Sequence, residues 1–256
     1  MCVTNKVIST PYIDVNMDIP ESHPRYISLK TRQKLVEGVE KGITSKAGLI
    51  AHGRGEALDY MIGEETIEPA LKAERAAVRA ILDADDPVIS VNGNVAALVP
   101  GEIVALSNIL KAKLEVNLFH RTDERIDRII KWLKEHGAEE ILGDEPDAEI
   151  PGLDHARALC ASEGIYTADV VLVPLEDGDR AQALSKMGKT VITIDLNPLS
   201  RTSRTADITI VDNIVRAVPM MIELEPLDSA FDNDENLADV LEHMSKRLLL
   251  QAGELS

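Results

Sequence analysis

Short apolar runs alternate with helical segments along residues 87–224, and this alternation constrains the fold more than any other feature of the sequence. Strands are predicted at 88–91, 114–119, 140–142, 169–175, 190–196 and 207–211. Helical periodicity lies between or after them, at 123–136, 179–187 and 214–224. Because strands that alternate with helices pair in parallel, the pattern predicts an α/β fold. We expect a Rossmann-like, doubly wound, mostly parallel sheet with helices on both faces.

The segments that flank this core are predicted to be helical. Helices are expected over 25–42, from the end of a glycine-containing segment at 52–56 to Ile62, and over 64–84. We therefore expect one domain over 22–256, made of a helical N-terminal part (22–86), a sheet-forming core (87–224) and a C-terminal helix (235–252). Residues 1–21 have no sustained period and contain Pro11 and Pro20, which predicts an extended N-terminal arm.

The charge balance restricts the possible partners. With 27 Lys and Arg against 44 Asp and Glu, the net charge is −17, and aromatic residues are 3% of the chain. This argues against a nucleic-acid-binding protein, which needs a basic face and stacking platforms. No signal peptide is visible, no apolar run approaches the roughly 18 residues of a membrane span, and Cys2 and Cys160 are the only cysteines. We expect a cytoplasmic protein without nucleic-acid or membrane partners.

Four polar loops follow the predicted strands, at 92–94, 120–122, 176–180 and 197–202. In doubly wound sheets, ligands bind where loops leave the carboxyl ends of the strands. The densest cluster runs from Asp195 to Arg204. An acid at a strand end suits a ribose hydroxyl, and arginines with hydroxyl residues suit phosphates. The alternative is a polar loop with local side-chain turns, but Arg201 and Arg204 in an acidic protein favour an anion site.

Two further segments each leave two interpretations open. Gly53-Arg54-Gly55 fits an anion site at a helix N-terminus, with Arg54 as donor, as well as it fits a tight turn between helices. Glu176, Asp177 and Asp179 fit a Mg²⁺ site, although Asp179 is better explained as the N-cap of the following helix.

Other motif matches are rejected. Gly188-Lys189-Thr190 is predicted to be a helix C-cap and not a phosphate-binding loop, since it lies between a helix and the next strand. The six histidines lack zinc-ligand spacing. The residues alone thus predict an α/β protein with an anion-binding cleft for a nucleotide.

The same segments resemble the archaeal phosphopantothenate synthetase family, also called 4-phosphopantoate–β-alanine ligase. The motifs that carry the resemblance are SHPRY (22–26), GLIAHGRGE (48–56), VISVNGNVAALVP (88–100), EVNLFHRT (115–122), VPLEDGDR (173–180), IDLNPLSRT (194–202) and ITIVDN (208–213). They cover most of the chain in one order.

The resemblance implies an ATP-dependent ligase of coenzyme A biosynthesis. It would join 4-phosphopantoate to β-alanine through an acyl-adenylate, giving 4′-phosphopantothenate, AMP and pyrophosphate. Family members look like homodimers. By position, the resemblance assigns ATP binding to Arg32, Arg54, Asp195, Leu196, Asn197, Arg201, Thr202, Asn213 and Ile214.

Other assignments are hypotheses from chemistry. We expect Asn92, Asn94 and Arg121, on strand-end loops, to bind phosphopantoate, and Mg²⁺ to accompany ATP because the triphosphate charge must be neutralised. No catalytic base is identified, and Asp177 is a candidate. The alternatives are a small-molecule kinase releasing ADP and a non-catalytic, nucleotide-binding regulatory protein. A nicotinamide-dependent oxidoreductase is disfavoured by the incomplete glycine motif.

Overall fold

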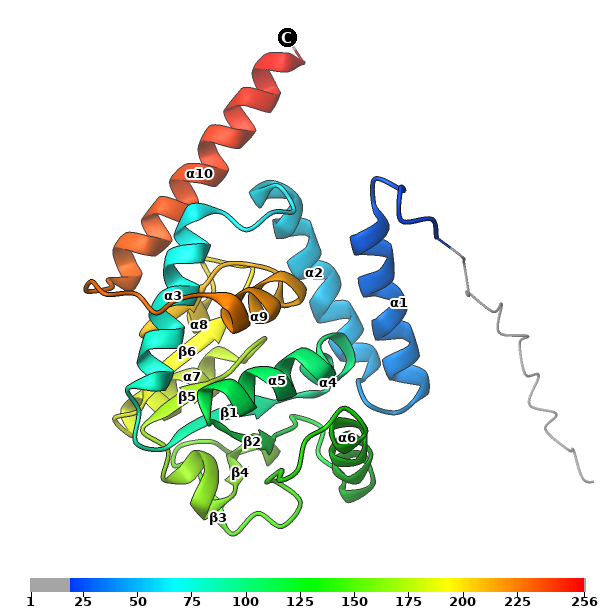
Figure 1. The fold of residues 1–256 in the computed structure, drawn as a ribbon, viewed down its shortest axis with the longest axis vertical. Helices are drawn as coiled ribbons and strands as arrows, with labels where there is room; N and C mark the ends of the chain where they lie inside the picture. Colours follow the sequence, from blue (N-terminus) through cyan, green and yellow to red (C-terminus); the bar gives the residue numbers. More distant parts are fainter. Residues whose placement is uncertain (1–18, 256) are drawn as a thin grey trace, which may run out of the picture.

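A parallel five-stranded sheet lies at the centre of the computed structural model, which describes residues 19–255 (Figure 1). Its strands are β1 (Pro87–Val91), β2 (Lys113–Val116), β5 (Val170–Leu172), β6 (Thr190–Ile194) and β7 (Ile208–Ile210). The order is β2-β1-β5-β6-β7, with every pair parallel. The strand order reverses between β1 and β5, which is where doubly wound sheets open a crevice. The predicted arm at 1–21 lies outside the described residues except for its last three positions.

Both faces of the sheet are buried. Ile89, Leu172 and Ile192 pack into one core with α3 (Glu68–Leu82), α5 (Pro100–Leu110) and α9 (Ile214–Glu223). Their strand neighbours Val171 and Val191 point to the other face, where α7 (Gly178–Lys186) covers them. Burial on both faces explains why these strands are continuous apolar runs in the sequence. The prediction of a doubly wound sheet is confirmed.

The helix that contains the GLIAHGRGE motif differs from its prediction. Helix α2 (Lys46–Ile62) begins directly after Ser45, whose side chain accepts a hydrogen bond from the amide of Gly48. Gly53 and Gly55 therefore lie inside the helix. The expected helix start near Gly53 is wrong, and neither of the two alternatives for this segment, a helix N-terminus that binds an anion or a tight turn between helices, is present there. The neighbouring helix α1 (Tyr26–Glu40) lies beside α2 and agrees with its prediction (Figure 1).

Two helices that follow β1 were not predicted. Helix α4 (Gly93–Leu98) is capped by Asn92, whose Oδ1 accepts from the amides of Asn94 and Val95, and α5 follows it directly. The segment after β6 also contains a short helix, α8 (Arg201–Thr205), where a loop was expected. Helix α6 (Asp123–Glu135) is close to its predicted bounds.

A segment without α-helix, here called the 143–169 excursion, lies between α6 and β5. It contains β3 (Ala148–Glu149) paired antiparallel with β4 (Leu159–Cys160), a 3-10 turn η1 (Ala156–Ala158) and a π-type turn η2 (Ser162–Tyr166). The strand predicted at 140–142 is reduced to a single bridge between Leu142 and Glu115. Polar side chains of β2 and the segment after it hold this excursion, as described below.

Helix α10 (Asn233–Glu254) ends the described chain. Its first half packs on α2 and α3, and its last turns project beyond the body of the protein (Figure 1). Three consecutive leucines on the projecting part, 248–250, are exposed. Within residues 19–255, no helix has the length and apolar character needed to span a bilayer.

Candidate active site at the carboxyl ends of the strands

A cavity of about 280 Å³ opens where the strand order reverses. Its walls come from the loops after β1, β2 and β5, from the start of α2, and from two arginines, Arg125 of α6 and Arg157 of the 143–169 excursion. This is the position predicted from the parallel sheet. A larger cavity of about 600 Å³ lies between α1, α5 and α6, away from the strand ends.

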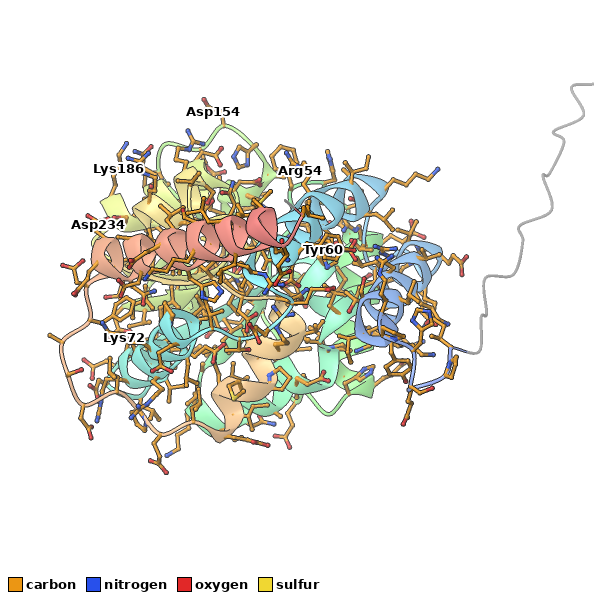
Figure 2. All side chains as sticks on the ribbon, turned by 90° about the horizontal axis from the view of Figure 1, so that it is seen from above. Arg54, Tyr60, Lys72, Asp154, Lys186 and Asp234 are labelled. Atoms are coloured by element: carbon orange, nitrogen blue, oxygen red, sulfur yellow. The ribbon has the colours of Figure 1, made fainter. Side chains whose placement is uncertain are left out.

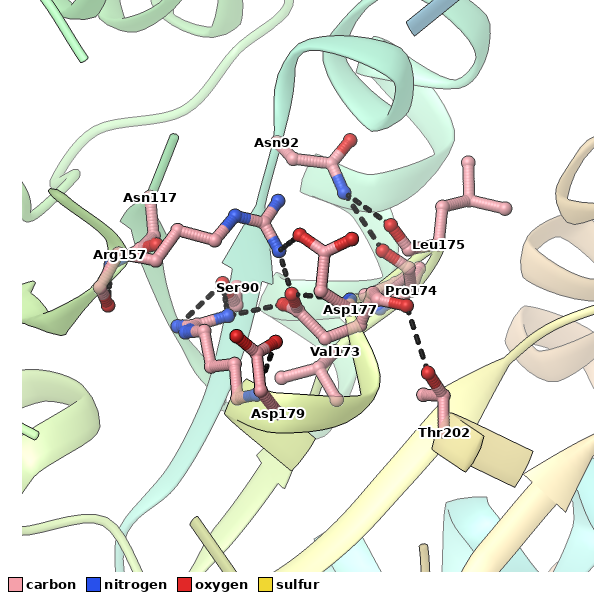
Figure 3. A network of polar contacts seen from close by, with 12 residues as sticks. Ser90, Asn92, Asn117, Arg157, Val173, Pro174, Leu175, Asp177, Asp179 and Thr202 are labelled. Atoms are coloured by element: carbon pink, nitrogen blue, oxygen red, sulfur yellow. Dashed lines mark hydrogen bonds and ion pairs between the residues drawn. The ribbon is translucent and has the colours of Figure 1, made fainter. Parts of the chain in front are cut away.

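Two buried arginines share one buried carboxylate beside the cavity (Figure 3). Arg180 is fully buried, donates to Ser90 Oγ at 3.2 and 3.3 Å and forms an ion pair with Glu176. Arg157 forms a second ion pair with Glu176, and its Nη1 lies 3.5 Å from Asp177 Oδ2. Burial lowers the pKa of both guanidinium groups to about 10. Both arginines are therefore charged at neutral pH.

The three carboxylates after β5 do not converge. Glu176 points inward to the arginines, and Asp179 Oδ2 lies 3.0 Å from His155 Nε2. Burial opposes ionisation of Asp179, but hydrogen bonds from His155 and from the Arg180 amide lower its pKa. The prediction that Asp179 caps α7 is wrong, because Asp177 occupies the N-cap position. No group of three potential metal-ligating side chains occurs within 19–255, so the alternative of a Mg²⁺ site made by these three carboxylates is not formed.

Arg125 is held against the cavity by backbone carbonyls. Its Nε and Nη2 donate to Ile43 O at 3.2 and 3.0 Å, and its Nη1 donates to His120 O at 3.1 Å. Burial lowers its pKa. The guanidinium lies across Gly93, where an added Cβ would contact Nη2 and would also lie 2.6 Å from Ile43 O. Glycine at this position therefore makes room for the arginine.

Of the three residues expected to bind phosphopantoate, two line the cavity and one does not. Asn92 and Asn94 line the cavity. Asn92 Nδ2 donates to Pro174 O at 2.9 Å, and Asn94 Nδ2 donates to Gly48 O at 2.9 Å. Both side chains therefore fix the shape of the wall. Arg121 does not line this cavity; its guanidinium donates to Gly143 O and Asp144 O at 2.7 and 2.9 Å, and so holds the start of the 143–169 excursion.

Five of the residues assigned to ATP lie in the loop after β6 and the start of α8. The Asp195 carboxylate accepts from Ser200 Oγ at 2.5 Å and from the Asn197 amide at 2.9 Å. Burial raises the Asp195 pKa, although these hydrogen bonds oppose the shift. Leu196 is buried, and Thr202 Oγ1 donates to Glu176 O at 2.9 Å, which ties this loop to the one after β5. Arg201 is exposed, with Nη2 4.0 Å from Asp179 Oδ1.

Helix α2 crosses the ends of the strands in the order of the sheet. A Cβ at Gly48 would lie 2.5 Å from Asn94 Oδ1 after β1, and one at Gly55 would lie 3.4 Å from Leu196 Cδ1 after β6. Asp59 reaches the loop after β7, where Asn213 Nδ2 donates to it at 2.9 Å. Arg54 is exposed on this helix, next to the contact with Leu196 (Figure 2).

The remaining residues that the resemblance assigns to ATP are Arg32, Asn213 and Ile214. Arg32, on α1, donates to both carboxylate oxygens of Glu56 on α2, with Nη2 at 2.8 Å from Oε1. Asn213 caps α9 through its Oδ1, and Ile214 is buried. Eight of the nine assigned residues thus lie at the ends of β6 and β7 or on α2, while Arg32 comes from α1.

A buried charged cluster supports the end of β7. Arg216 bridges Asp212 and Asp59, with Nη2 2.7 Å from Asp59 Oδ1. Thr66 Oγ1 donates to Asp212 Oδ2 at 2.6 Å. Glu74 on α3 is fully buried nearby, and neither carboxylate oxygen has a hydrogen-bond partner among the described residues. Burial, with a smaller contribution from Asp212, raises its pKa to about 9. Glu74 is therefore protonated at neutral pH.

Arg125 and Arg157 line the cavity but were not predicted as site residues. Arg157 lies in a stretch without helical or strand periodicity, and nothing in the sequence relates it to the loops after β1 and β5. The only usable signal for Arg125 is its place two residues after the predicted start of a helix that follows a polar strand-end loop. Arg180 was included only as the end of the polar loop at 176–180.

The fold and the site define a doubly wound α/β protein with a crevice, lined in part by Arg125 and Arg157, at the carboxyl ends of its strands. Within this class the chain belongs to the phosphopantothenate/pantothenate synthetase family, whose model matches residues 69–253. A 4-phosphopantoate–β-alanine ligase of Thermococcus kodakarensis is 58% identical over 251 residues, covering 93% of this chain and 96% of the relative. Proteins of the same name from Thermococcus onnurineus and Methanosarcina mazei are 59% and 56% identical, covering 90% and 93% of this chain and 93% and 98% of the relatives.

Proposed function

We propose that this chain is an ATP-dependent ligase that joins 4-phosphopantoate to β-alanine and forms 4′-phosphopantothenate, a step of coenzyme A biosynthesis. The observation that carries the proposal is the 58% identity to a ligase of this name over almost the whole of both chains. The crevice adds independent support, because an acid that carries both a phosphate and a carboxylate, like a triphosphate, needs positive charge near the strand ends.

On the nucleotide side, we assign ATP to the nine positions described above. Asp195 suits a ribose hydroxyl, and Arg201, Arg54 and Arg32 suit phosphates. Thr202 is tied to Glu176 of the neighbouring loop, so the nucleotide loop and the cavity share one wall. The carboxylate of the acid would then lie close to the α-phosphate, beside the wall that the two sites share.

The chemistry follows from the weakness of a carboxylate as an electrophile. Attack of the phosphopantoate carboxylate on the α-phosphate expels pyrophosphate and gives an acyl-adenylate. The β-alanine amine, once it has lost a proton, attacks the acyl carbon and expels AMP. The residues contribute mainly by positioning and charge stabilisation. Asp177, exposed at the mouth of the cavity, is the candidate base for the amine.

Mg²⁺ in this proposal accompanies the nucleotide. Glu176 and Asp179 are engaged with Arg157, Arg180 and His155, and the described residues do not form a protein-held metal site. Asp177 is the most exposed of the three carboxylates after β5. Mg²⁺ is commonly held by substrate phosphates, water and one or two carboxylates. Its contribution would be to neutralise triphosphate charge. Full activity in excess EDTA would contradict this part.

The decisive experiment incubates the purified protein with ATP, Mg²⁺, 4-phosphopantoate and β-alanine and separates the nucleotides by chromatography. AMP and phosphopantothenate that appear only when both substrates are present support the ligase and the adenylate route. ADP would indicate an acyl-phosphate route or a kinase. Nucleotide binding without turnover would indicate the regulatory protein.

Three further assignments belong to the proposal. Residues 22–256 would act as one ligase domain, since α1, α2 and α10 all contact the sheet-bearing part or each other. The protein would work as a homodimer in the cytoplasm. The exposed leucines at 248–250, with Ile27 and Ile50 on α1 and α2, are apolar surface that a second copy would cover. Light scattering after gel filtration measures the number of subunits.

A further inference from the structure

Asn213, one of the positions assigned to ATP, is buried, and each of its four polar atoms has a partner inside the protein. Its Nδ2 donates to Asp59 Oδ2 at 2.9 Å, and its Oδ1 accepts from the Val215 amide at 3.3 Å. Its own amide donates to Asp212 Oδ1 at 2.7 Å, and its carbonyl accepts from the Arg216 amide at 2.8 Å. A residue engaged in this way serves a nucleotide site through the position that it gives to the start of α9.

Asp59 is the partner that reaches Asn213 from a distant part of the chain. Its side chain is 5% exposed and lies on α2. Arg216 donates to both of its oxygens, from Nη2 to Oδ1 at 2.7 Å and from Nη1 to Oδ2 at 3.2 Å. A buried carboxylate needs such partners to replace its lost hydration. Because a forked pairing also fixes the plane of the carboxylate, Arg216 turns Oδ2 of Asp59 toward Asn213.

Helix α2 also carries Arg54, another position assigned to ATP. Arg54 lies five positions before Asp59, a rise of about 7.5 Å along the helix. The hydrogen bond between Asp59 and Asn213 therefore joins the helix that bears Arg54 to the start of α9. The described residues that line the cavity at the strand reversal do not include Asp59, Asn213 or Arg216. This contact thus belongs to the nucleotide side of the crevice.

We propose that Asp59 is a positioning residue for ATP binding. It sets the separation between Arg54 on α2 and the pair Asn213–Ile214 at the start of α9, and Arg216 orients its carboxylate for this role. The inference rests on the ATP assignment made in the proposed function and adds a residue outside the nine assigned positions. Binding of ATP should depend on the contact between Asp59 and Asn213, whereas binding of the acid and of β-alanine should not.

Calorimetric titration with ATP and Mg²⁺ tests this contact in Asp59→Ala, Asn213→Ser and the double variant. In Asp59→Ala the guanidinium of Arg216 keeps Asp212 as its partner, so no buried charge loses all compensation. Asn213→Ser keeps an N-cap oxygen for α9 but removes the donor to Asp59. Each single change should raise the Kd for ATP roughly 5- to 30-fold. The double variant should bind no more weakly than the weaker single variant, because both changes break the same contact.

Steady-state kinetics separate positioning from general damage to the fold. The KM for ATP should rise with the Kd, while the KM values for 4-phosphopantoate and β-alanine should stay within about twofold of wild type. If Asp59→Ala does not fold, Arg216→Lys takes its place in the cycle with Asn213→Ser, since lysine keeps the charge but not the fork. Circular dichroism checks that each variant is folded at the temperature of the titration.

Asp169→Asn is the matched control. Asp169 also joins separate segments, since it accepts from the amides of Asp85 and Asp86 at 2.8 and 2.9 Å, but it precedes β5 at the opposite ends of the strands. It should lower the melting temperature and leave the Kd for ATP unchanged.

The inference is overturned if Asp59→Ala binds ATP as wild type does, if the double variant shows the full product of the two single effects, or if the KM for 4-phosphopantoate rises as much as that for ATP. A loss of ATP binding in Asp169→Asn equal to that in Asp59→Ala would also overturn it, and so would wild-type protein that binds no ATP. Wild-type protein that binds ATP but forms no phosphopantothenate would refute the proposed function instead, and the Kd values would still decide the role of Asp59.

Discussion

The buried Glu74 predicts a stability that falls with pH. Its pKa is raised from 4.5 to about 9 in the folded protein, chiefly by burial. Above pH 4.5 the unfolded chain releases this proton, whereas the folded chain retains it up to about pH 9. Because the folded state binds more protons over this interval, rising pH favours unfolding. At 1.36 kcal/mol per pH unit, the cost at pH 7.5 is roughly 4 kcal/mol.

Replacing Glu74 by Gln should therefore stabilise the protein, and increasingly so as pH rises. The amide is neutral at every pH and has nearly the same shape. We expect the stability difference between Glu74→Gln and wild type to grow by roughly 3 kcal/mol between pH 5 and pH 7.5. The assay is urea unfolding followed by circular dichroism at several pH values, with the m-value held in common.

Glu68→Gln is the matched control, because Glu68 lies on the same helix and is exposed. It should leave the pH dependence of stability unchanged. Parallel stability curves for wild type and Glu74→Gln across this pH range would refute the reasoning. The groups acting on Glu74 would then keep it ionised, and Arg216, which favours its charged form, would outweigh burial and Asp212.

Three further changes test the local packing. Gly93→Ala should destabilise the protein by about 1–3 kcal/mol, since the methyl group would collide with Arg125 and Ile43 O; an unchanged melting temperature would contradict this. Gly53→Ala should instead stabilise it by about 0.5–1 kcal/mol, because Gly53 lies within α2 with no atom within 4 Å of the added Cβ; a lower melting temperature would show that α2 is not continuous there. Glu115→Ala removes the acceptor of two buried amides and should cost roughly 2–5 kcal/mol. Hydrogen exchange should accelerate at Ala161 and Ile165, and unchanged protection there would exclude Glu115 as their anchor.

The sheet was predictable because its strands are buried on both faces, which leaves continuous apolar runs such as 170–173 in the sequence. Helix α2 was misjudged because two glycines within three residues are typical of a break. The structure shows another use of glycine, since Gly48 allows α2 to approach the Asn94 side chain closely. That requirement comes from tertiary contacts and has no local signal.

The arginines of the cavity were unpredictable for a related reason. Arg157 reaches the crevice through two-residue strands and short turns, which have too few positions for a period. Its placement depends on two side chains distant in the sequence, Glu115 on β2 and Asn117 directly after that strand. The loop after β6 was identifiable because its polar residues directly follow an apolar strand, although its hydrogen bonds within the loop were not.

Because α2 crosses the strand ends, its length between these contacts cannot change without moving them. Gly55 lies seven positions after Gly48, a rise of about 10.5 Å along the helix. This is close to the spacing of roughly 9.6 Å between β1 and the second strand beyond it. One inserted residue between them would turn everything downstream by about 100°. Asp59 would then leave Arg216, and a bulkier side chain would replace Gly55 against Leu196. A single-codon insertion or deletion in this helix would therefore separate the loops that it joins.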